Sequence, residues 1–328
     1  MRSIAIHRFG GPEVLAPLER TTPRPGPGEV AIDVAFAGLN FGEVLFRRGV
    51  LPDLPLPFVP GLEASGRVRA LGEGVSGLKP GQRVVALTIV GGGAYAEVAI
   101  APAALVVPVP DGIDLATAAG LPSNLSTAMQ ILHDVAPVRA GETVLVHAAA
   151  GGVGGLLGQV AKAAGAGRVI GTVGSPAKRA HALARGYDEV IVGADFIRDP
   201  QAALGEAAVT LAIDPVGGDL RRASLQALAP HGRLVVMGNA SDAPDVTVST
   251  QDLWFSGRSV GGYILLSEAQ RDPARVSAAL RRGLEWVAEG RIRAEVSEVL
   301  ALDDAAEAHR RIESRATTGK LVFRVQGD

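Results

Sequence analysis

The stretch VHAAAGGVGG, residues 146–155, contains no charged side chain, and it decides the fold. The run ETVLV, residues 142–146, leads into this stretch and predicts a β-strand. From Val153 to Ala164 the sequence predicts a helix, whose apolar face carries Leu156, Leu157, Val160 and Ala161. A strand, a bare glycine-rich turn and an amphipathic helix in this order are typical of a dinucleotide-binding site.

The turn matches the dinucleotide fingerprint G-x-G-x-x-G at two of its three glycines, because Ala149 replaces the first one. Gly151 would let the backbone come close to a pyrophosphate, and Gly154 would let the helix pack closely on the strand. The pyrophosphate would bind the free amides at the helix N-terminus, chiefly those of Gly152 and Val153. Side chains would block this approach, which explains why the segment is bare.

Strands and helices alternate after this turn. The expected strands are RVIGTV, DEVIV, VTLAID, RLVVMG and SVGGYIL. The helix SPAKRAHALARG follows the first of them, with Ser175 as N-cap, Pro176 at the first helical position and Gly186 at its end. Strict alternation predicts a doubly wound parallel sheet with right-handed crossovers.

The region before residue 122 has a different pattern. Short alternating runs such as EVAIDV, residues 29–34, are separated by Gly and Pro roughly every 8–12 residues, which predicts an antiparallel barrel or sandwich. Two amphipathic helices and the strand KLVFRV follow Tyr263, and we expect them to return to this first domain. The predicted division is therefore 1–122 with 264–328 for one domain and 123–263 for the other.

Composition excludes several classes of protein. The 328 residues suggest two domains, and 47% hydrophobic with 20% charged residues is typical of a soluble globular protein. A formal net charge of −2 gives no basic footprint for nucleic acid. The absence of cysteine excludes disulfides, a thiol nucleophile and a cysteine-ligated metal.

Two further expectations concern location. Residues 143–161 carry no formal charge, but their five glycines predict strand, turn and helix, not a membrane span. The first segment, MRSIAIHRFGG, lacks the apolar core of a signal peptide, so we expect a cytoplasmic protein.

At VLVHAAAGGVG the chain resembles the quinone oxidoreductases of the medium-chain dehydrogenase/reductase superfamily. The resemblance continues, in order, through GLNFGEVLFRRG, VPGLEASGRV, GTVGSPAKR, IDPVGGD, MGN and ESRATTGKLVF. It implies an α/β fold with a GroES-like β-barrel catalytic domain, completed by the last part of the chain, and an inserted Rossmann domain. It also implies hydride transfer from NADPH in the cleft between the two domains.

The resemblance implies residues for two kinds of site. The substrate-pocket residues are Asn40, Leu45 and Thr127. The cofactor-binding residues are Asn40, Phe41, Thr127, Gly151, Gly152, Val153, Gly154, Gly174, Ser175, Lys178, Arg179, Val216, Gly238, Asn239, Arg315 and Lys320. For Asn40 the alternative is an ordinary turn residue, and for Thr127 it is a hydroxyl bonded to the backbone at a helix start.

No metal site is expected. Zinc-dependent relatives place a Cys after a first-domain strand and a His in a Gly-His-Glu segment, where this chain has Leu39 or Asn40 and then Leu62. A zinc site needs three or four suitable ligands, and the six histidines are scattered along the chain.

The catalytic proton donor is unassigned. Many quinone reductases carry a Tyr facing the substrate where this chain has Leu45, and Glu43 is interpreted as facing solvent. His147 is interpreted as a strand-end residue and not as a catalyst. The proton would then come from water, the cofactor ribose or an unidentified group. General-acid catalysis contributes about 10²–10⁴-fold where it exists, and a quinone needs it least.

The loop after the second Rossmann strand predicts NADPH over NADH. NAD-specific folds place an acid about 20 residues beyond the glycines, but no acid appears here before Asp188. Ser175, Lys178 and Arg179 offer a hydroxyl and two cations to a 2′-phosphate instead. The alternative is that both cations form a solvated helix face.

Three functions fit these features. The leading one is an NADPH-dependent reductase of quinones or α,β-unsaturated carbonyl compounds. The others are an enoyl-thioester reductase, for which Arg47 and Arg48 hint at a basic channel, and an NADPH-binding protein without turnover, acting as a redox sensor or crystallin-like component. We also expect a homodimer through SVGGYIL, residues 259–265, because an apolar edge strand can pair with its symmetry mate.

Overall fold

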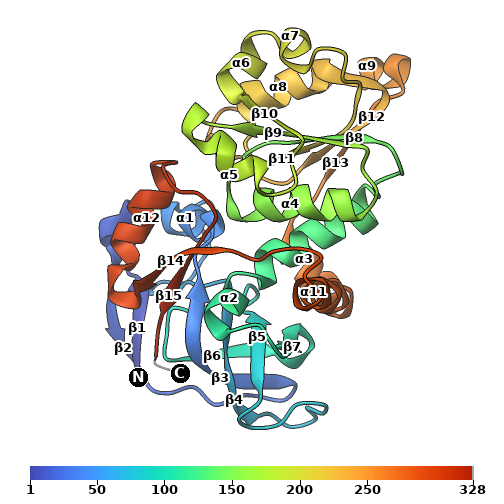
Figure 1. Ribbon diagram of the computed structural model, residues 1–328. Coiled ribbons are helices and arrows are strands. Elements are labelled where there is room, and N and C mark those ends of the chain that lie inside the picture. Colours follow the sequence, from blue (N-terminus) through green and yellow to red (C-terminus); the bar gives the residue numbers. More distant parts are fainter. Residues whose placement is uncertain (327–328) are drawn as a thin grey trace. The chain divides into compact units, whose positions relative to one another are not determined.

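The computed structural model describes residues 1–326. The chain divides into two compact units (Figure 1). The first unit comprises Met1–Ser126, Leu265–Gly290 and residues 294–326, and the second comprises Thr127–Ile264 with Arg291–Arg293.

The second unit contains a six-stranded sheet in the order β10-β9-β8-β11-β12-β13. Its strands are β8 (Thr143–Val146), β9 (Arg168–Val173), β10 (Glu189–Val192), β11 (Val209–Asp214), β12 (Leu228–Val236) and β13 (Ser259–Gly262). All neighbouring strands are parallel. Counted along the chain the order is 3-2-1-4-5-6, which is the Rossmann arrangement, and this confirms the predicted doubly wound sheet.

Helices cover both faces of this sheet, with α4 and α5 on one face and α6, α7 and α8 on the other (Figure 1). The helices of this region are α3 (Pro122–Gln130), η3 (Ile131–Val135), α4 (Gly152–Ala163), η4 (Pro176–Lys178), α5 (Arg179–Leu183), α6 (Gly193–Arg198), α7 (Pro200–Leu204), α8 (Gly218–Ala227) and α9 (Thr250–Ser256). The helix predicted over residues 175–186 is therefore split into a 3-10 turn and the short α5. Ser175 occupies the N-cap position in extended conformation without a side-chain capping bond, and Gly186 has φ of 86°.

The first unit contains a seven-stranded sheet in the order β14-β15-β3-β4-β5-β7, with β6 also paired to β3, and a separate β1-β2 pair. Its strands are β1 (Arg2–Ile6), β2 (Leu15–Glu19), β3 (Glu29–Gly38), β4 (Glu63–Leu71), β5 (Arg83–Leu87), β6 (Val98–Pro102), β7 (Val106–Pro108), β14 (Val296–Ala301) and β15 (Lys320–Arg324). Every pair is antiparallel except β14 with β15. The late strand β15 pairs with β3, so the last part of the chain completes the first sheet.

The first unit also contains helices. They are η1 (Pro12–Val14), α1 (Phe41–Arg48), η2 (Ala103–Leu105), α2 (Leu115–Ala119), α10 (Leu265–Arg271), α11 (Pro273–Ala288), η5 (Leu302–Asp304) and α12 (Ala305–Glu313). Of these, α1 begins directly after β3, at Asn40 as N-cap.

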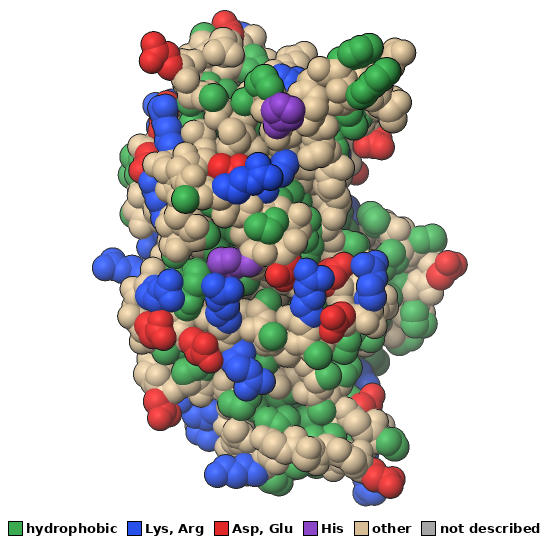
Figure 2. Space-filling model, turned by 90° about the vertical axis from the view of Figure 1, so that its right-hand side faces the viewer, with side chains coloured by type: hydrophobic (Ala, Val, Ile, Leu, Met, Phe, Trp, Pro, Cys, Tyr) green, Lys and Arg blue, Asp and Glu red, His purple; other side chains and the backbone are tan. Residues whose placement is uncertain are grey.

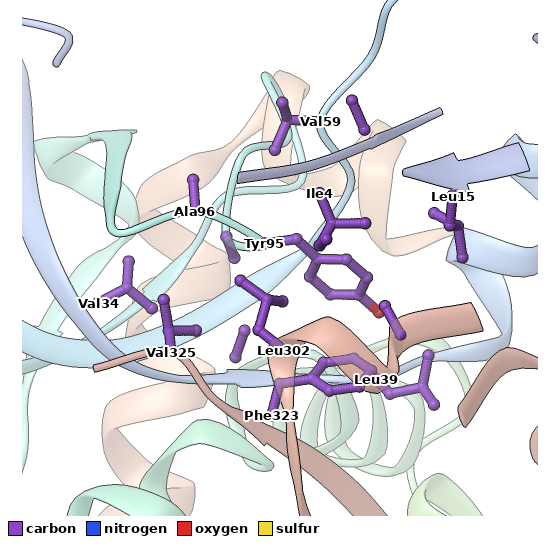
Figure 3. Close-up of a cluster of buried hydrophobic side chains, with 14 of the residues drawn as sticks. Ile4, Leu15, Val34, Leu39, Val59, Tyr95, Ala96, Leu302, Phe323 and Val325 are labelled. Atoms are coloured by element: carbon purple, nitrogen blue, oxygen red, sulfur yellow. The ribbon is translucent and has the colours of Figure 1, made fainter. Parts of the chain in front are cut away.

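A hydrophobic core supports the end of β3. Figure 3 shows Tyr95 and Phe323 among aliphatic side chains, with Leu39 beside them. The rings of Tyr95 and Phe323 meet edge to face with centroids 4.9 Å apart, and both residues are fully buried. Aromatic pairs of this geometry add to the stabilisation that burial gives. The chain at Leu39, immediately before Asn40, is therefore held firmly.

Acidic and basic side chains are interspersed on the face shown in Figure 2. Within residues 1–326, no helix combines the length and apolar character needed to cross a membrane.

Candidate functional site

The turn after β8 has the close packing that its glycines predict. A Cβ at Gly154 would overlap the carbonyl oxygen of Ala148 and lie 2.9 Å from Cα of Ala149, so the first turn of α4 approaches the strand end too closely for any side chain. Gly151 is less constrained, since its Cβ would lie 3.3 Å from the same oxygen. Ala148 adopts φ of 55°, a left-handed conformation that turns the chain sharply into the helix.

Helix α4 begins at Gly152, with Gly151 as N-cap. The amides of the first helical turn have no acceptor within the helix, and the helix dipole adds partial positive charge there. Gly151, Gly152 and Val153 are all partly exposed. The turn can therefore receive a diphosphate on backbone donors, as the sequence predicts.

His147, next to Ala148 at the start of this turn, is hydrogen-bonded to two neighbouring elements. It is fully buried, its Nδ1 lies 2.8 Å from Thr172 Oγ1, and its Nε2 lies 2.5 Å from Ser224 Oγ. Ser224 donates to the Leu220 carbonyl, so it accepts from Nε2–H, and the Thr172 hydroxyl then donates to Nδ1. Burial lowers the pKa of His147 to about 4. His147 is thus a neutral residue joining β8, β9 and α8, which agrees with the structural interpretation of this residue.

The loop after β9 contains the residues predicted to select the cofactor. Gly174 is exposed, and no atom lies within 4 Å of the Cβ that another residue would carry there. Ser175 and Lys178 are partly exposed, Arg179 is exposed, and burial lowers the pKa of Lys178. The structure therefore places a hydroxyl and two cationic side chains in one short turn next to the end of β9.

The loops after β11 and β12 are bound to each other. The amide of Ala240 donates to Pro215 O at 3.0 Å, and that of Ser241 donates to Val216 O at 2.8 Å. Asn239 donates from Nδ2 to Ala243 O at 2.9 Å and accepts from Ser241 Oγ at 3.2 Å, so its side chain organises its own loop.

These two loops also leave little room for side chains. The Cβ of any other residue at Gly217, which has φ of 83°, would overlap Oδ1 of Asn239. A Cβ at Gly238 would lie 2.9 Å from Pro215 O. Val216, Gly238 and Asn239, all predicted cofactor residues, therefore share one compact surface at the carboxyl ends of adjacent strands.

In the first unit the structure joins Asn40 to Lys320 and to Glu63. Asn40 Nδ2 donates to Glu63 Oε1 at 2.8 Å, and Lys320 Nζ donates to Asn40 Oδ1 at 2.6 Å. Lys320 and Glu63 are buried and form an ion pair of 2.5 Å. Glu63 also accepts from the amide of Ser123 at 2.7 Å. The Asn40 amide is therefore fixed in one orientation, and its role as a site residue stays a prediction.

The expectation that Glu43 faces solvent is wrong, because the residue is fully buried. Its carboxylate accepts from the amides of Asn40, at 2.9 Å, and Leu62, at 3.0 Å, and so caps α1 while tying it to the chain before β4. Burial raises the pKa of Glu43 to about 7; Lys320 and the Leu62 amide oppose this increase, and Glu63 adds to it.

The remaining predicted residues occupy separate positions. Phe41 and Leu45 lie on α1 and are partly exposed. Thr127 is buried in the second turn of α3, past the helix start that the alternative interpretation assumed. Arg315 follows α12 with φ of 56° and is exposed.

Residues 1–326 contain no cluster of three or more His, Cys, Asp or Glu side chains that could hold a metal ion.

Sequence reasoning missed Glu63, Asp214 and Arg221, which are buried and bind predicted site residues or loops. Asp214 gave the clearest signal, because it ends the otherwise apolar strand VTLAID. A carboxylate at the carboxyl end of a buried parallel strand is costly to bury unless it has partners.

A GroES-like sheet joined to a Rossmann sheet defines the class of medium-chain dehydrogenases and reductases. The family described as alcohol dehydrogenase GroES-like domain matches residues 26–111, and that described as zinc-binding dehydrogenase matches residues 185–323. A probable quinone oxidoreductase of Schizosaccharomyces pombe is 36% identical over 325 residues, which cover 98% of this chain and 96% of that protein. The chain belongs to the quinone oxidoreductase family of this superfamily.

Solved structures agree with this assignment. A mycobacterial protein complexed with NADPH has a TM-score of 0.90 and 35% identity, with 99% of each chain covered. The Escherichia coli quinone oxidoreductase complexed with NADPH has a TM-score of 0.90 and 32% identity, with 99% of this chain and 100% of that chain covered.

Proposed function

We propose that this chain is an NADPH-dependent reductase that transfers hydride to quinones or to α,β-unsaturated carbonyl compounds without a metal. The observation that carries the proposal is the turn at Ala148–Gly154, which follows the inner strand β8 of the Rossmann sheet and leads into α4, where Gly154 in the first helical turn has no space for a Cβ. The two NADPH complexes among similar structures support the cofactor, and the quinone oxidoreductases among the relatives support the reaction.

Different elements of the chain would hold different parts of the cofactor. The amides at the start of α4 would bind the diphosphate, and Ser175, Lys178 and Arg179 would bind the 2′-phosphate that distinguishes NADPH. Val216, Gly238 and Asn239 would contact the nicotinamide half. Asn40, oriented by Glu63 and Lys320, would line the substrate side. Bound NADPH would supply the hydride.

A quinone suits this site better than a substrate that needs a strong general acid. Leu45 offers no proton where many relatives carry Tyr, and the carboxylate of Glu43 is engaged by two backbone amides. A quinone that has received hydride is an oxyanion, which water can protonate. The experiment is NADPH oxidation with a panel of quinones, enals and enoyl thioesters. Turnover of quinones supports the proposal, turnover of thioesters alone would favour an enoyl-thioester reductase, and NADPH binding without turnover would favour a sensor or structural role.

We further propose a homodimer formed through β13. The strand lies at the edge of the Rossmann sheet, and three of its four residues are exposed. Trp254 and Phe255, on α9 just before it, are 75% and 77% exposed and stack on each other, and Ile264 after it is 59% exposed. Exposed apolar side chains beside an unpaired strand edge suit association with a second copy. Light scattering should show a dimer at micromolar concentration, and a monomer would contradict the proposal.

The metal independence and the cytoplasmic location expected from the sequence stay predictions.

A further inference from the structure

A buried ion pair lies at the carboxyl ends of β11 and β12. Asp214, the last residue of β11, is fully buried, and Arg221, in the second turn of α8, is 6% exposed. Arg221 Nε donates to Asp214 Oδ2 at 2.7 Å. Buried ion pairs often contribute little net stability, because both charges lose their hydration. The role of this pair is therefore sought in the other groups that Asp214 and Arg221 bind and not in net stabilisation by the pair.

Each member of the pair binds a different loop. Asp214 Oδ1 accepts from the amides of Val216, at 2.7 Å, and Gly217, at 2.9 Å. Arg221 Nη2 donates to the carbonyl oxygen of Gly238 at 2.6 Å. One guanidinium thus joins the loop after β11, through Asp214, to the loop after β12. A planar guanidinium can do this because its nitrogens are separate donors in a fixed geometry, whereas lysine carries all its donors on one nitrogen.

A dinucleotide lies across the carboxyl ends of a Rossmann sheet, with one mononucleotide on each half. The diphosphate turn follows β8, and the loop with Lys178 follows β9, so the adenosine half belongs to β8–β10. The nicotinamide half then belongs to β11–β13, where Arg221 ties the two loops. We propose that Arg221 is a positioning residue that holds these loops in the conformation that receives the nicotinamide half of NADPH. This inference rests on the proposed function.

Comparing the binding of two ligands distinguishes a positioning role of Arg221 from a merely structural one. A general loss of packing would weaken every ligand of the second unit alike. A misplaced pair of loops would weaken the binding of NADPH but spare 2′-phospho-ADP, which has the diphosphate and the 2′-phosphate but lacks the nicotinamide and its ribose.

The test compares Arg221→Lys with the wild type and with Arg222→Lys. Arg222 is the next residue, is exposed, and pairs with Asp219 on the helix surface, so it is a matched control. Dissociation constants for NADPH and for 2′-phospho-ADP are measured by calorimetry. We expect Arg221→Lys to raise the NADPH constant about tenfold, because the two loops must then be ordered when the nicotinamide half binds, and to change the fragment constant less than twofold. Arg222→Lys should change neither. Equal weakening of both ligands by Arg221→Lys, or of neither, would overturn the inference.

A second variant tests the inference if Arg221→Lys does not fold. Asp214→Asn combined with Arg221→Gln leaves no unpaired buried charge, and it should show the same difference between the two ligands. If this variant binds NADPH as the wild type does, the inference is wrong. If the wild type itself does not bind NADPH, the proposed function fails first, so the two failures are distinguishable.

Discussion

Two neighbouring glycines in the first turns of α4 should respond oppositely to the same substitution. A Cβ at Gly154 would overlap Ala148 O and lie 3.0 Å from its carbonyl carbon, and these are backbone atoms that cannot rotate away. At Gly155 the nearest atoms to the new Cβ are Cγ and Cδ of Arg185, at 3.8 Å and 4.0 Å, which is ordinary contact.

The magnitudes follow from this geometry. Gly154→Ala must push the helix start away from β8, and overpacking of this kind costs about 1–3 kcal/mol of unfolding free energy. Gly155→Ala gains helix propensity, worth up to about 1 kcal/mol, with no compensating clash. The amides that would bind the diphosphate move with the helix start in the first variant only. Loss of one charge-assisted hydrogen bond should raise the NADPH dissociation constant of Gly154→Ala roughly 10- to 100-fold.

Urea unfolding followed by circular dichroism, together with calorimetric titration of NADPH, checks both expectations. Equal destabilisation by the two substitutions would refute the reasoning, since they differ only in the space beside the Cβ. Unchanged NADPH binding by a folded Gly154→Ala would refute the assignment of the diphosphate to this turn.

Three further predictions concern the cofactor, the metal and pH. Lys178→Ala should raise KM for NADPH roughly 10- to 100-fold and leave KM for NADH nearly unchanged, as steady-state kinetics with both cofactors would show; equal use of both by the wild type would contradict this. Elemental analysis should find less than stoichiometric zinc, and prolonged chelation should leave activity unchanged; a loss of activity that zinc restores would disprove metal independence. The pKa of buried His147 lies near 4 in the fold against 6.5 in the unfolded chain, so acidification through this range protonates the unfolded chain first and lowers stability. The advantage in unfolding free energy of wild type over His147→Gln should therefore shrink by about 3 kcal/mol from pH 7 to pH 4, and a constant difference would exclude a neutral buried histidine.

Backbone-determined features could be predicted from the sequence, whereas side-chain partnerships could not. The turn at Ala148–Gly154 could be predicted because the need for glycine there arises from atoms a few residues away in the sequence. The strand order could be predicted because alternating strands and helices allow few topologies. Glu43 was misjudged because its partners include Leu62, 19 residues onward, whose amide gives no signal in the sequence.

The two adjacent arginines of α8 make the same point. Arg221 and Arg222 are the same amino acid and have the same helix propensity. One is buried because Asp214 and Gly238 O lie beneath it, and the other is exposed beside Asp219. Only the packing of α8 on the sheet determines which of the two arginines is buried.

The pairing of β15 with β3 has a consequence for biosynthesis. Phe36–Gly38, the segment of β3 next to Asn40, pairs with β15, and Lys320 arrives with the same strand. About 280 residues must be translated between these two segments, which takes roughly 15–55 s at the usual rates of synthesis. Residues Thr127–Ile264, the main segment of the second unit, are translated within that interval. Nascent chains stopped before Lys320 should therefore resist protease over residues 127–264 while the β3 edge stays open, and the cluster that orients Asn40 is assembled last.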